Sequence, residues 1–206
     1  IYYEYGTESG NYTARTIYTE LPADESIHLL IENLEPNTRY YYRMRYRESG
    51  EGDFSTRNEY SFHTQRPKGS SFSFVIEADP HMMSSNSAEA FELSLGKMLA
   101  DQPDFMLDLG DTFFIDRYLR EGPLTHEQVL GRVQLLRSYF DLINHSVPLF
   151  LVNGNHEGEW GRFLDGTADN IAVMGTLQRK AYFPNPEPNS FYSGGTTMED
   201  FIGLRQ

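Results

Sequence analysis

Three short polar motifs in the sequence carry side chains that could bind metal ions. They read Asp79-Pro80-His81, Gly110-Asp111 and Gly154-Asn155-His156-Glu157. Oxygen and imidazole-nitrogen ligands suit Mn, Fe, Zn or Mg. One such aspartate or histidine alone is more often a turn residue or a solvated residue. Because all three motifs directly follow short apolar segments, their succession instead predicts a metal site.

The residue types suggest how the motifs would share the binding. In an extended segment, residues two apart point the same way, so Asp79 and His81 are expected to face one ion. Asp111 has two carboxylate oxygens, which makes it the natural ligand to bridge two ions. Asn155 would add a neutral carbonyl oxygen. His156 then remains beside the metals as a candidate catalytic residue.

The segments around these motifs alternate between strand and helix patterns. Buried strands are expected over residues 72–78, 105–109 and 147–152. Helices are expected between them, the first capped by Asn86 with Glu89 and the second by a capping box of Thr125 with Gln128. The apolar faces of these helices would consist of Phe91, Leu95, Met98 and Leu99, and of Val129, Val133, Leu136, Phe140 and Ile143. Such an alternation predicts a parallel sheet whose strands bring the motifs together at their carboxyl ends.

Residues 1–66 follow a different pattern, which is typical of a small antiparallel β-sandwich. Short alternating segments rich in Tyr, Thr and Ile occupy residues 1–5, 14–21, 27–32, 39–47 and 58–64. The turn before Tyr40 predicts a tyrosine corner, in which the tyrosine hydroxyl bonds back to that turn. This part resembles a fibronectin type III domain, but a partial one, because such a sandwich has about seven strands. A linker over residues 67–71 would lead to a second domain over residues 72–206.

Composition and missing motifs exclude several other classes of function. The formal net charge of −13, with no basic stripe, argues against a nucleic-acid-binding surface. The absence of cysteine excludes disulfides, Cys-ligated zinc and thiol nucleophiles. No apolar run approaches the roughly 18 residues that span a bilayer. Trp160 stands where an HExxH zinc motif needs its second histidine, and the sequence contains neither a Walker-type phosphate loop nor a G-x-S-x-G elbow.

With the motifs in this order, residues 72–206 resemble the front half of a calcineurin-like metallophosphoesterase, an α/β/β/α sandwich. The resemblance implies a dinuclear centre of divalent or trivalent ions, with Fe, Mn, Zn and Mg all compatible. Asp79, His81 and Asp111 match ligands of the first ion. Asp111 and Asn155 match ligands of the second.

The same resemblance implies the hydrolysis of a phosphate ester, either a monoester or a diester. A metal-bound hydroxide would attack phosphorus. His156 would stabilise or protonate the leaving oxygen, and Glu157 would hold the His156 imidazole in place. Loop residues that could contact the substrate are Asn153, Arg117, Tyr118, Arg120 and Arg162.

The preceding sandwich is similar to that of secreted purple acid phosphatase-type and alkaline phosphatase D-type enzymes, which implies an extracellular or periplasmic location. Two residues depart from the purple acid phosphatase pattern. His81 stands in place of a glycine, and Phe114 stands in place of an iron-binding tyrosine. The tyrosinate-to-iron colour of those enzymes is therefore not expected.

The chain is expected to be incomplete at both ends. No histidine follows His156, although the family completes its site with later histidine motifs. With only Asp111 and Asn155 left for the second ion, the fragment alone is expected to bind two ions poorly and to be inactive. The alternative is a non-catalytic binding or scaffolding module with a vestigial metal site, and the oligomeric state stays open.

Overall fold

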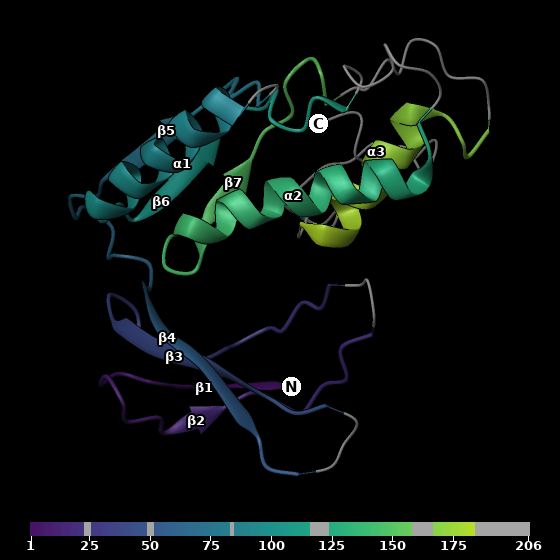
Figure 1. Ribbon diagram of the computed structural model, residues 1–206. Helices are drawn as coiled ribbons and strands as arrows, with labels where there is room; N and C mark the ends of the chain where they lie inside the picture. The colour runs from purple at the N-terminus through teal and green to yellow at the C-terminus, as the bar shows by residue number, and fades with distance from the viewer. Residues whose placement is uncertain (23–25, 49–51, 83–84, 116–123, 158–166, 184–206) are drawn as a thin grey trace.

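The computed structural model describes residues 1–22, 26–48, 52–82, 85–115, 124–157 and 167–183. They form one antiparallel sheet and one parallel sheet. In Figure 1 the antiparallel sheet lies below, and the parallel sheet with its helices lies above it. The expected mixed architecture, with an antiparallel part followed by an α/β part, is confirmed.

The antiparallel sheet has the strand order β2-β1-β3-β4. Its strands are β1 (Tyr2–Gly6), β2 (Ala14–Arg15), β3 (Arg39–Tyr46) and β4 (Ser55–His63). The predicted tyrosine corner is present, since the backbone N–H of Glu35 donates to the Tyr40 hydroxyl at 3.0 Å. This bond ties the turn before β3 to the start of that strand.

Two of the expected strands in this part differ from the structure. The segment 14–21 contributes only the two residues of β2, and the segment 27–32 forms no strand. The side chains of Ile27, Leu29 and Ile31 still line one shared cavity with residues of the sheet. The alternation of apolar and polar residues over 27–32 therefore indicates which side chains face the sheet. It does not require the backbone of this segment to pair with a strand. The described residues form one sheet here, and the fibronectin-like sandwich and the domain boundaries stay predictions.

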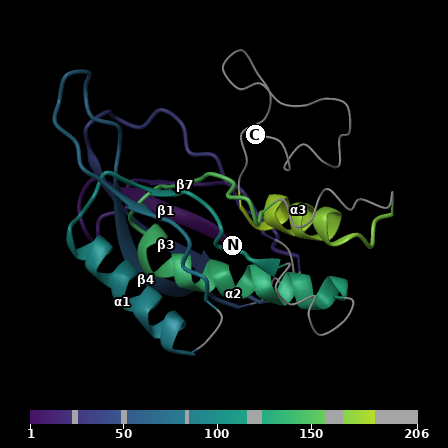
Figure 2. The same ribbon diagram turned by 90° about the horizontal axis from the view of Figure 1, so that it is seen from above.

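The parallel sheet has the strand order β5-β6-β7, and both pairings are parallel, as the alternation predicted. Its elements are β5 (Phe74–Glu77), α1 (Ser85–Ala100), β6 (Phe105–Asp108), α2 (His126–Asn144), β7 (Leu149–Leu151) and α3 (Ile171–Tyr182). Helix α2 packs against both α1 and α3, and lies between them when seen from above (Figure 2).

The helix starts agree with the sequence in one case and differ in two. Thr125 and Gln128 form the predicted capping box at the start of α2. Helix α1 already begins at Ser85, so Asn86 lies inside its first turn and the prediction of an Asn86 cap was wrong. Helix α3 was not predicted; it starts after Asn170, whose side-chain oxygen accepts from the Ala172 N–H at 2.9 Å.

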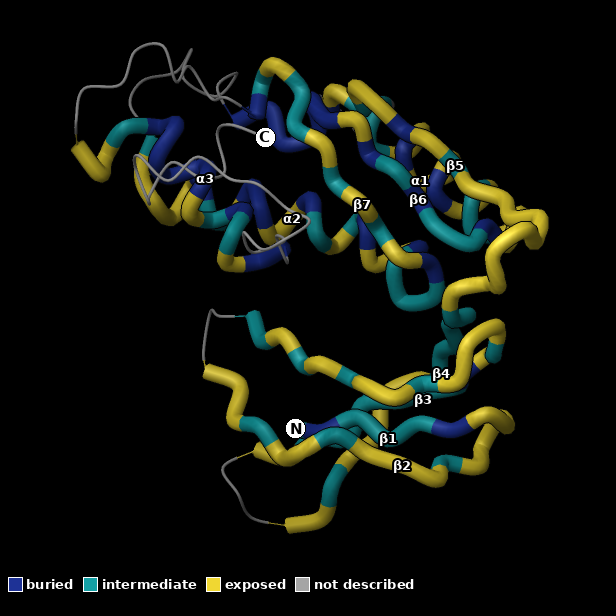
Figure 3. The backbone as a smooth tube through the Cα atoms, turned by 180° about the vertical axis from the view of Figure 1, so that it is seen from behind, coloured by how far each residue is buried: buried dark blue, intermediate teal, exposed yellow. Residues whose placement is uncertain are grey.

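The helices cover only one face of the parallel sheet. The predicted apolar residues of α2 are all buried there, together with Phe91 and Leu95 of α1. On the other face, Phe74, Ile76 and Phe150 are 45%, 50% and 53% exposed, and parts of β5 and β7 are coloured as exposed in Figure 3. The prediction of fully buried strands was wrong on this face, because no described element packs against it.

The two parts of the chain contact each other at the end of α2. The Tyr42 hydroxyl donates to the backbone oxygen of His145 at 2.6 Å, and the Tyr60 ring stacks on the His145 imidazole at 4.3 Å. Arg66 also pairs with Asp104 at 2.7 Å. No helix in the described part of the chain is long and apolar enough to cross a bilayer.

Candidate metal centre

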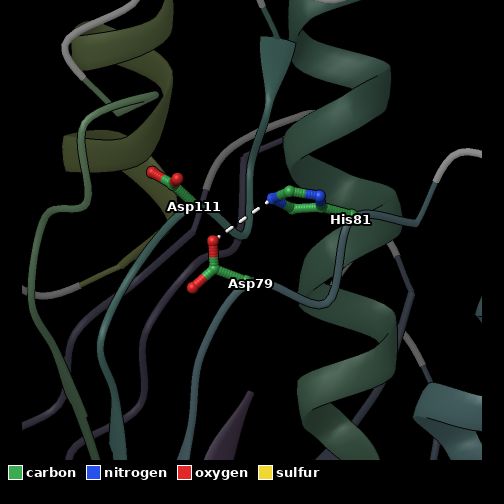
Figure 4. A group of neighbouring side chains, drawn as sticks. All are labelled: Asp79, His81 and Asp111. Carbon is green, nitrogen blue, oxygen red and sulfur yellow. Dashed lines mark ion pairs between the residues drawn. The ribbon is translucent and has the colours of Figure 1, made fainter.

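Three of the four predicted metal ligands converge at the carboxyl ends of β5 and β6. Asp79, His81 and Asp111 each offer one ligand atom, and these atoms lie within 4.8 Å of one another. Figure 4 shows the His81 imidazole pointing toward Asp79, with Nε2 3.3 Å from the Asp79 Oδ1 atom. Asp79 and His81 are exposed, whereas Asp111 is 7% exposed. The group is therefore accessible to solvent at Asp79 and His81 and buried at Asp111.

The backbone brings these residues together in a different way from that expected. Asp79, His81 and Asp111 have φ angles of +53°, +41° and +56°, in the left-handed region. The prediction that Asp79 and His81 lie in an extended segment was therefore wrong. Left-handed backbone is uncommon for residues other than glycine, and such strain concentrates at functional sites. A tight turn, and not the alternation of a strand, points the two side chains at one place.

Two glycines allow the loops after β6 and β7 to touch. A Cβ atom added to Gly154 would lie 2.2 Å from Asp111 Oδ1 and 2.5 Å from the Asp111 backbone nitrogen. A Cβ atom added to Gly110 would lie 2.0 Å from the Gly154 nitrogen, and Gly110 also has a φ of +92°. Any side chain at either position would separate the loops. The glycines thus determine how closely the third motif approaches Asp111.

Glu157 joins these two loops through its carboxylate. Oε2 accepts the N–H groups of Asp111 at 2.6 Å and Gly154 at 2.7 Å. Oε1 accepts those of Thr112 at 2.9 Å and Phe113 at 3.1 Å. Glu157 is 2% exposed, so these four bonds lie away from water. The carboxylate is therefore committed to the backbone around Asp111.

Glu157 was predicted to hold the His156 imidazole because the two residues are adjacent in the sequence. Both of its carboxylate oxygens instead bind the amides on either side of the ligand loop. The backbone N–H of His156 donates to Asp111 Oδ1 at 2.8 Å. The Asp111 backbone thus donates to Glu157 of the third motif, and the His156 backbone of that motif donates to the Asp111 side chain.

A second layer of buried polar groups lies beneath the loops. Asp108 is fully buried, and its oxygens accept from the Gly110 N–H at 2.7 Å and the Thr112 hydroxyl at 2.9 Å. Burial raises the pKa of Asp108 to about 6, while these two donors act in the opposite direction. From α3, the Arg179 guanidinium donates to the Glu157 backbone oxygen at 2.7 Å. Helix α3 thus supports the third motif, a contact that the sequence did not suggest.

Glu77 is the buried carboxylate of this region that lacks hydrogen-bond donors. It lies on β5, is 9% exposed, and neither carboxylate oxygen has a hydrogen-bond partner in the described structure. Burial, together with the nearby carboxylates of Asp108, Asp79 and Glu157, raises the pKa of Glu77 to about 8. Beneath the site, the Asp108 carboxylate thus accepts several hydrogen bonds, whereas the Glu77 carboxylate accepts none in the described structure.

The remaining predicted residues are placed unevenly. Asn155 is exposed and His156 is half-buried, both on the loop after β7. Asn153 is half-buried and lines a cavity of about 30 Å³ with Thr176 and Arg179, on the side of α3. The predicted substrate contacts Arg117, Tyr118, Arg120 and Arg162 lie outside the described residues.

The donor set fits a metal ion. Two carboxylates and one imidazole provide oxygen and nitrogen ligands, which suit Mn, Fe, Zn or Mg alike. Glu77, Asp108 and Arg179 were not among the residues predicted for the site. Asp108 and Glu77 could have been found from their positions, since each follows by two residues an apolar side chain on the covered face of its strand, Met106 and Val75 respectively.

Comparisons with known proteins agree with this geometry. The family model described as calcineurin-like phosphoesterase matches residues 72–203, which is more than half of the chain. Purple acid phosphatase 23 of Arabidopsis thaliana is 27% identical over 188 residues, which are 75% of this chain and 38% of that protein.

A solved structure gives the corresponding result for the fold. The purple acid phosphatase isolated from yellow lupin (Lupinus luteus) seeds matches with a TM-score of 0.62 and 19% identity, over 91% of this chain and 36% of that one. The chain therefore spans less than two fifths of the length of either relative. By the match of the family model and the arrangement of its motifs, the chain belongs to the calcineurin-like phosphoesterase family.

Proposed function

We propose that the protein hydrolyses phosphate esters at a dinuclear metal centre located where β5, β6 and β7 end. The observation that carries the proposal is the convergence of Asp79, His81 and Asp111 within 4.8 Å. These side chains come from two different loops, and their backbones are held in left-handed conformations. Such an arrangement is hard to explain as a set of solvated turn residues.

The ligands divide between two ions as follows. Asp79, His81 and Asp111 would hold the first ion, and Asp111 and Asn155 would hold the second. The chemistry that such ions supply in two-metal hydrolases is polarisation of a phosphoryl oxygen and activation of a water molecule. Asp111 is suited to the bridging position because its backbone is fixed by Glu157 and its Oδ1 by the His156 N–H.

His156 is the proposed proton donor to the leaving oxygen. Its backbone is bonded to Asp111 Oδ1 at 2.8 Å, so its position follows that of the bridging ligand. The residue is half-buried, on the loop after β7. A histidine is well suited to general acid catalysis near neutral pH. Glu157 acts on this step only by holding the loops in place.

The ligands in the described part of the chain are unequal for the two ions. One group of three candidate ligands, two carboxylates and one imidazole, is found there, and it suits one ion. The second would have only Asp111 and Asn155. We therefore propose that the present chain binds one ion tightly, binds a second weakly, and shows little activity alone. An extracellular or periplasmic location remains part of this proposal and rests on the family resemblance.

Metal binding provides the first test. Isothermal titration with Mn²⁺ should show one tight site, and Asp111→Asn should weaken it by about a hundredfold or more, since even partners outside the ligand shell contribute 10–100-fold. Asp101→Asn is the matched control, because Asp101 is exposed at the end of α1. Equal binding by the two variants would contradict the assigned ligands.

Hydrolysis provides the second test. p-Nitrophenyl phosphate and bis(p-nitrophenyl) phosphate separate a monoesterase from a diesterase, and both are assayed with this chain and with a longer parent protein. Activity on either ester that disappears in Asp111→Asn supports the proposal. If the longer protein binds no metal and cleaves neither ester, the proposed hydrolysis is contradicted and the alternative of a binding or scaffolding module with a vestigial metal site is favoured.

A further inference from the structure

The side chain of Phe114 lies between the two histidines of the candidate metal centre. Its ring centroid is 4.4 Å from that of His81, with the planes 23° apart in a stacked arrangement. It is 4.2 Å from that of His156, with the planes 63° apart in an edge-on arrangement. The ring thus contacts a predicted metal ligand on one side and the predicted proton donor on the other.

Phe114 is buried but lies outside the main hydrophobic cluster of the described residues. It is 1% exposed, so its ring is withdrawn from water. The contiguous core of the described residues nevertheless includes its neighbours Phe113 and Ile115 and omits Phe114. The Phe113 ring packs against Phe183 and lies under the Arg179 guanidinium, on the side of α3. Adjacent phenylalanines therefore face in different directions, one into the core and one toward the site.

The backbone at Phe114 is held in a conformation that favours this direction. Its φ angle is +52°, which is rare for a bulky aromatic residue. The preceding residue is fixed on both sides, because the Phe113 N–H donates to Glu157 Oε1 at 3.1 Å and the Phe113 carbonyl accepts from Arg132 Nε at 2.9 Å. A strained backbone persists only where its surroundings hold it. These buried bonds maintain the turn that places the ring between the histidines.

We propose that Phe114 is a positioning residue that fixes the ring planes of His81 and His156. Contact on a ring face and on a ring edge restricts rotation of both imidazoles before a metal ion or a substrate arrives. A ligand that is already ordered loses less entropy on binding, and residues behind the ligands of a metal site set its affinity for this reason. The inference rests on the proposed function for its catalytic meaning, while the restriction of the rings can be measured independently.

The test compares Phe114→Leu with Phe140→Leu in the metal-free protein. Phe140 is also 1% exposed, but its ring contacts Phe91 and Phe183 and no histidine of the site. Carbon-13 relaxation of labelled imidazoles reports the order of each histidine ring. In Phe114→Leu the order parameters of His81 and His156 should both fall toward the range of flexible groups, below about 0.6. In Phe140→Leu the order parameters of both histidines should stay as in the unsubstituted protein.

The other histidines provide an internal control. His145 is stacked on Tyr60 at 4.3 Å, far along the chain from Phe114, and its order should not change in Phe114→Leu. Mn²⁺ affinity is the second readout, and it should fall by about tenfold or more in Phe114→Leu. The fall in Phe140→Leu should be smaller.

The outcomes separate this inference from the proposed function. Unchanged order at His81 and His156 in Phe114→Leu, or an equal loss of Mn²⁺ affinity in both variants, would show that Phe114 only fills space. If the unsubstituted protein binds no Mn²⁺ but the two imidazole rings lose order in Phe114→Leu, then the positioning role stands and the proposed function is wrong. Urea midpoints of the two variants confirm that both remain folded during the measurement.

Discussion

Glu157→Gln should destabilise the protein strongly, because all four groups bonded to this buried carboxylate are hydrogen-bond donors. They are the N–H groups of Asp111 and Gly154 on Oε2, and those of Thr112 and Phe113 on Oε1. Glutamine must place an NH₂ group against one of these pairs, so two bonds to a charged acceptor are lost. At about 1.5–3 kcal/mol for each such bond, the free energy of unfolding should fall by about 3 kcal/mol or more.

Glu77→Gln is the matched control, with the opposite expected sign. Glu77 is also buried, at 9% exposed, but its carboxylate has no hydrogen-bond donor in the described structure, and its pKa rises from 4.5 to about 8 on folding. The folded protein therefore holds a proton that the unfolded chain releases between these two pH values. The free energy of unfolding then falls as pH rises through this window. At pH 7 the loss is about 3 kcal/mol, from 1.36 kcal/mol for each pH unit above 4.5.

Urea unfolding followed by circular dichroism, with EDTA present, measures both effects. With a slope of about 2 kcal/mol per molar urea, Glu157→Gln should lower the midpoint by roughly 1.5 M at pH 7. Glu77→Gln should raise it by a similar amount at pH 7 and change it little at pH 4. Hydrogen exchange adds a local readout, since one pair of amides, either those of Asp111 and Gly154 or those of Thr112 and Phe113, should lose protection in Glu157→Gln. An unchanged midpoint in Glu157→Gln, or shifts of both variants in the same direction, would refute the reasoning.

Three further substitutions test separate parts of the structure. Gly154→Ala places a Cβ atom 2.2 Å from Asp111 Oδ1, so Mn²⁺ affinity measured by titration should fall by about tenfold or more, and normal binding would show that the loops can separate. Tyr40→Phe removes the hydroxyl that accepts the Glu35 N–H, and the free energy of unfolding in urea should fall by about 1 kcal/mol. Thr125→Ala removes one half of the capping box of α2 and should cost about 1 kcal/mol, measured as a lower thermal midpoint; no change would mean that the cap is replaced by water.

Much of the fold in the α/β part could be predicted because its signals are local. Strand and helix patterns differ in period, so the order of β5, α1, β6, α2 and β7 followed from the sequence. The capping box of Thr125 and Gln128 also needs only residues three apart. Helix α3 was not predicted because its own buried residues lie on most sides of the helix. A helix that is buried on several faces shows no single apolar stripe in its sequence.

The candidate ligands could be predicted, but their geometry could not. Parallel strands place their carboxyl ends at one edge of the sheet, so residues after β5 and β6 had to meet. Whether Asp79 and His81 approached each other by a strand or by a turn depended on φ angles that the surrounding loops impose. The local rule for an extended chain gave the right neighbours for the wrong reason.

Sequence alone determined which residue types stand at the strand ends, and hence that carboxylate, imidazole and amide groups gather at one edge of the sheet. Only the tertiary structure decided what each group bonds to. Glu157 lies next to His156 in sequence, yet its side chain binds the Asp111 amide 46 residues away. Phe114 likewise meets two histidines from other loops. A buried group takes the partners that packing brings to it, and packing depends on residues far apart in the chain.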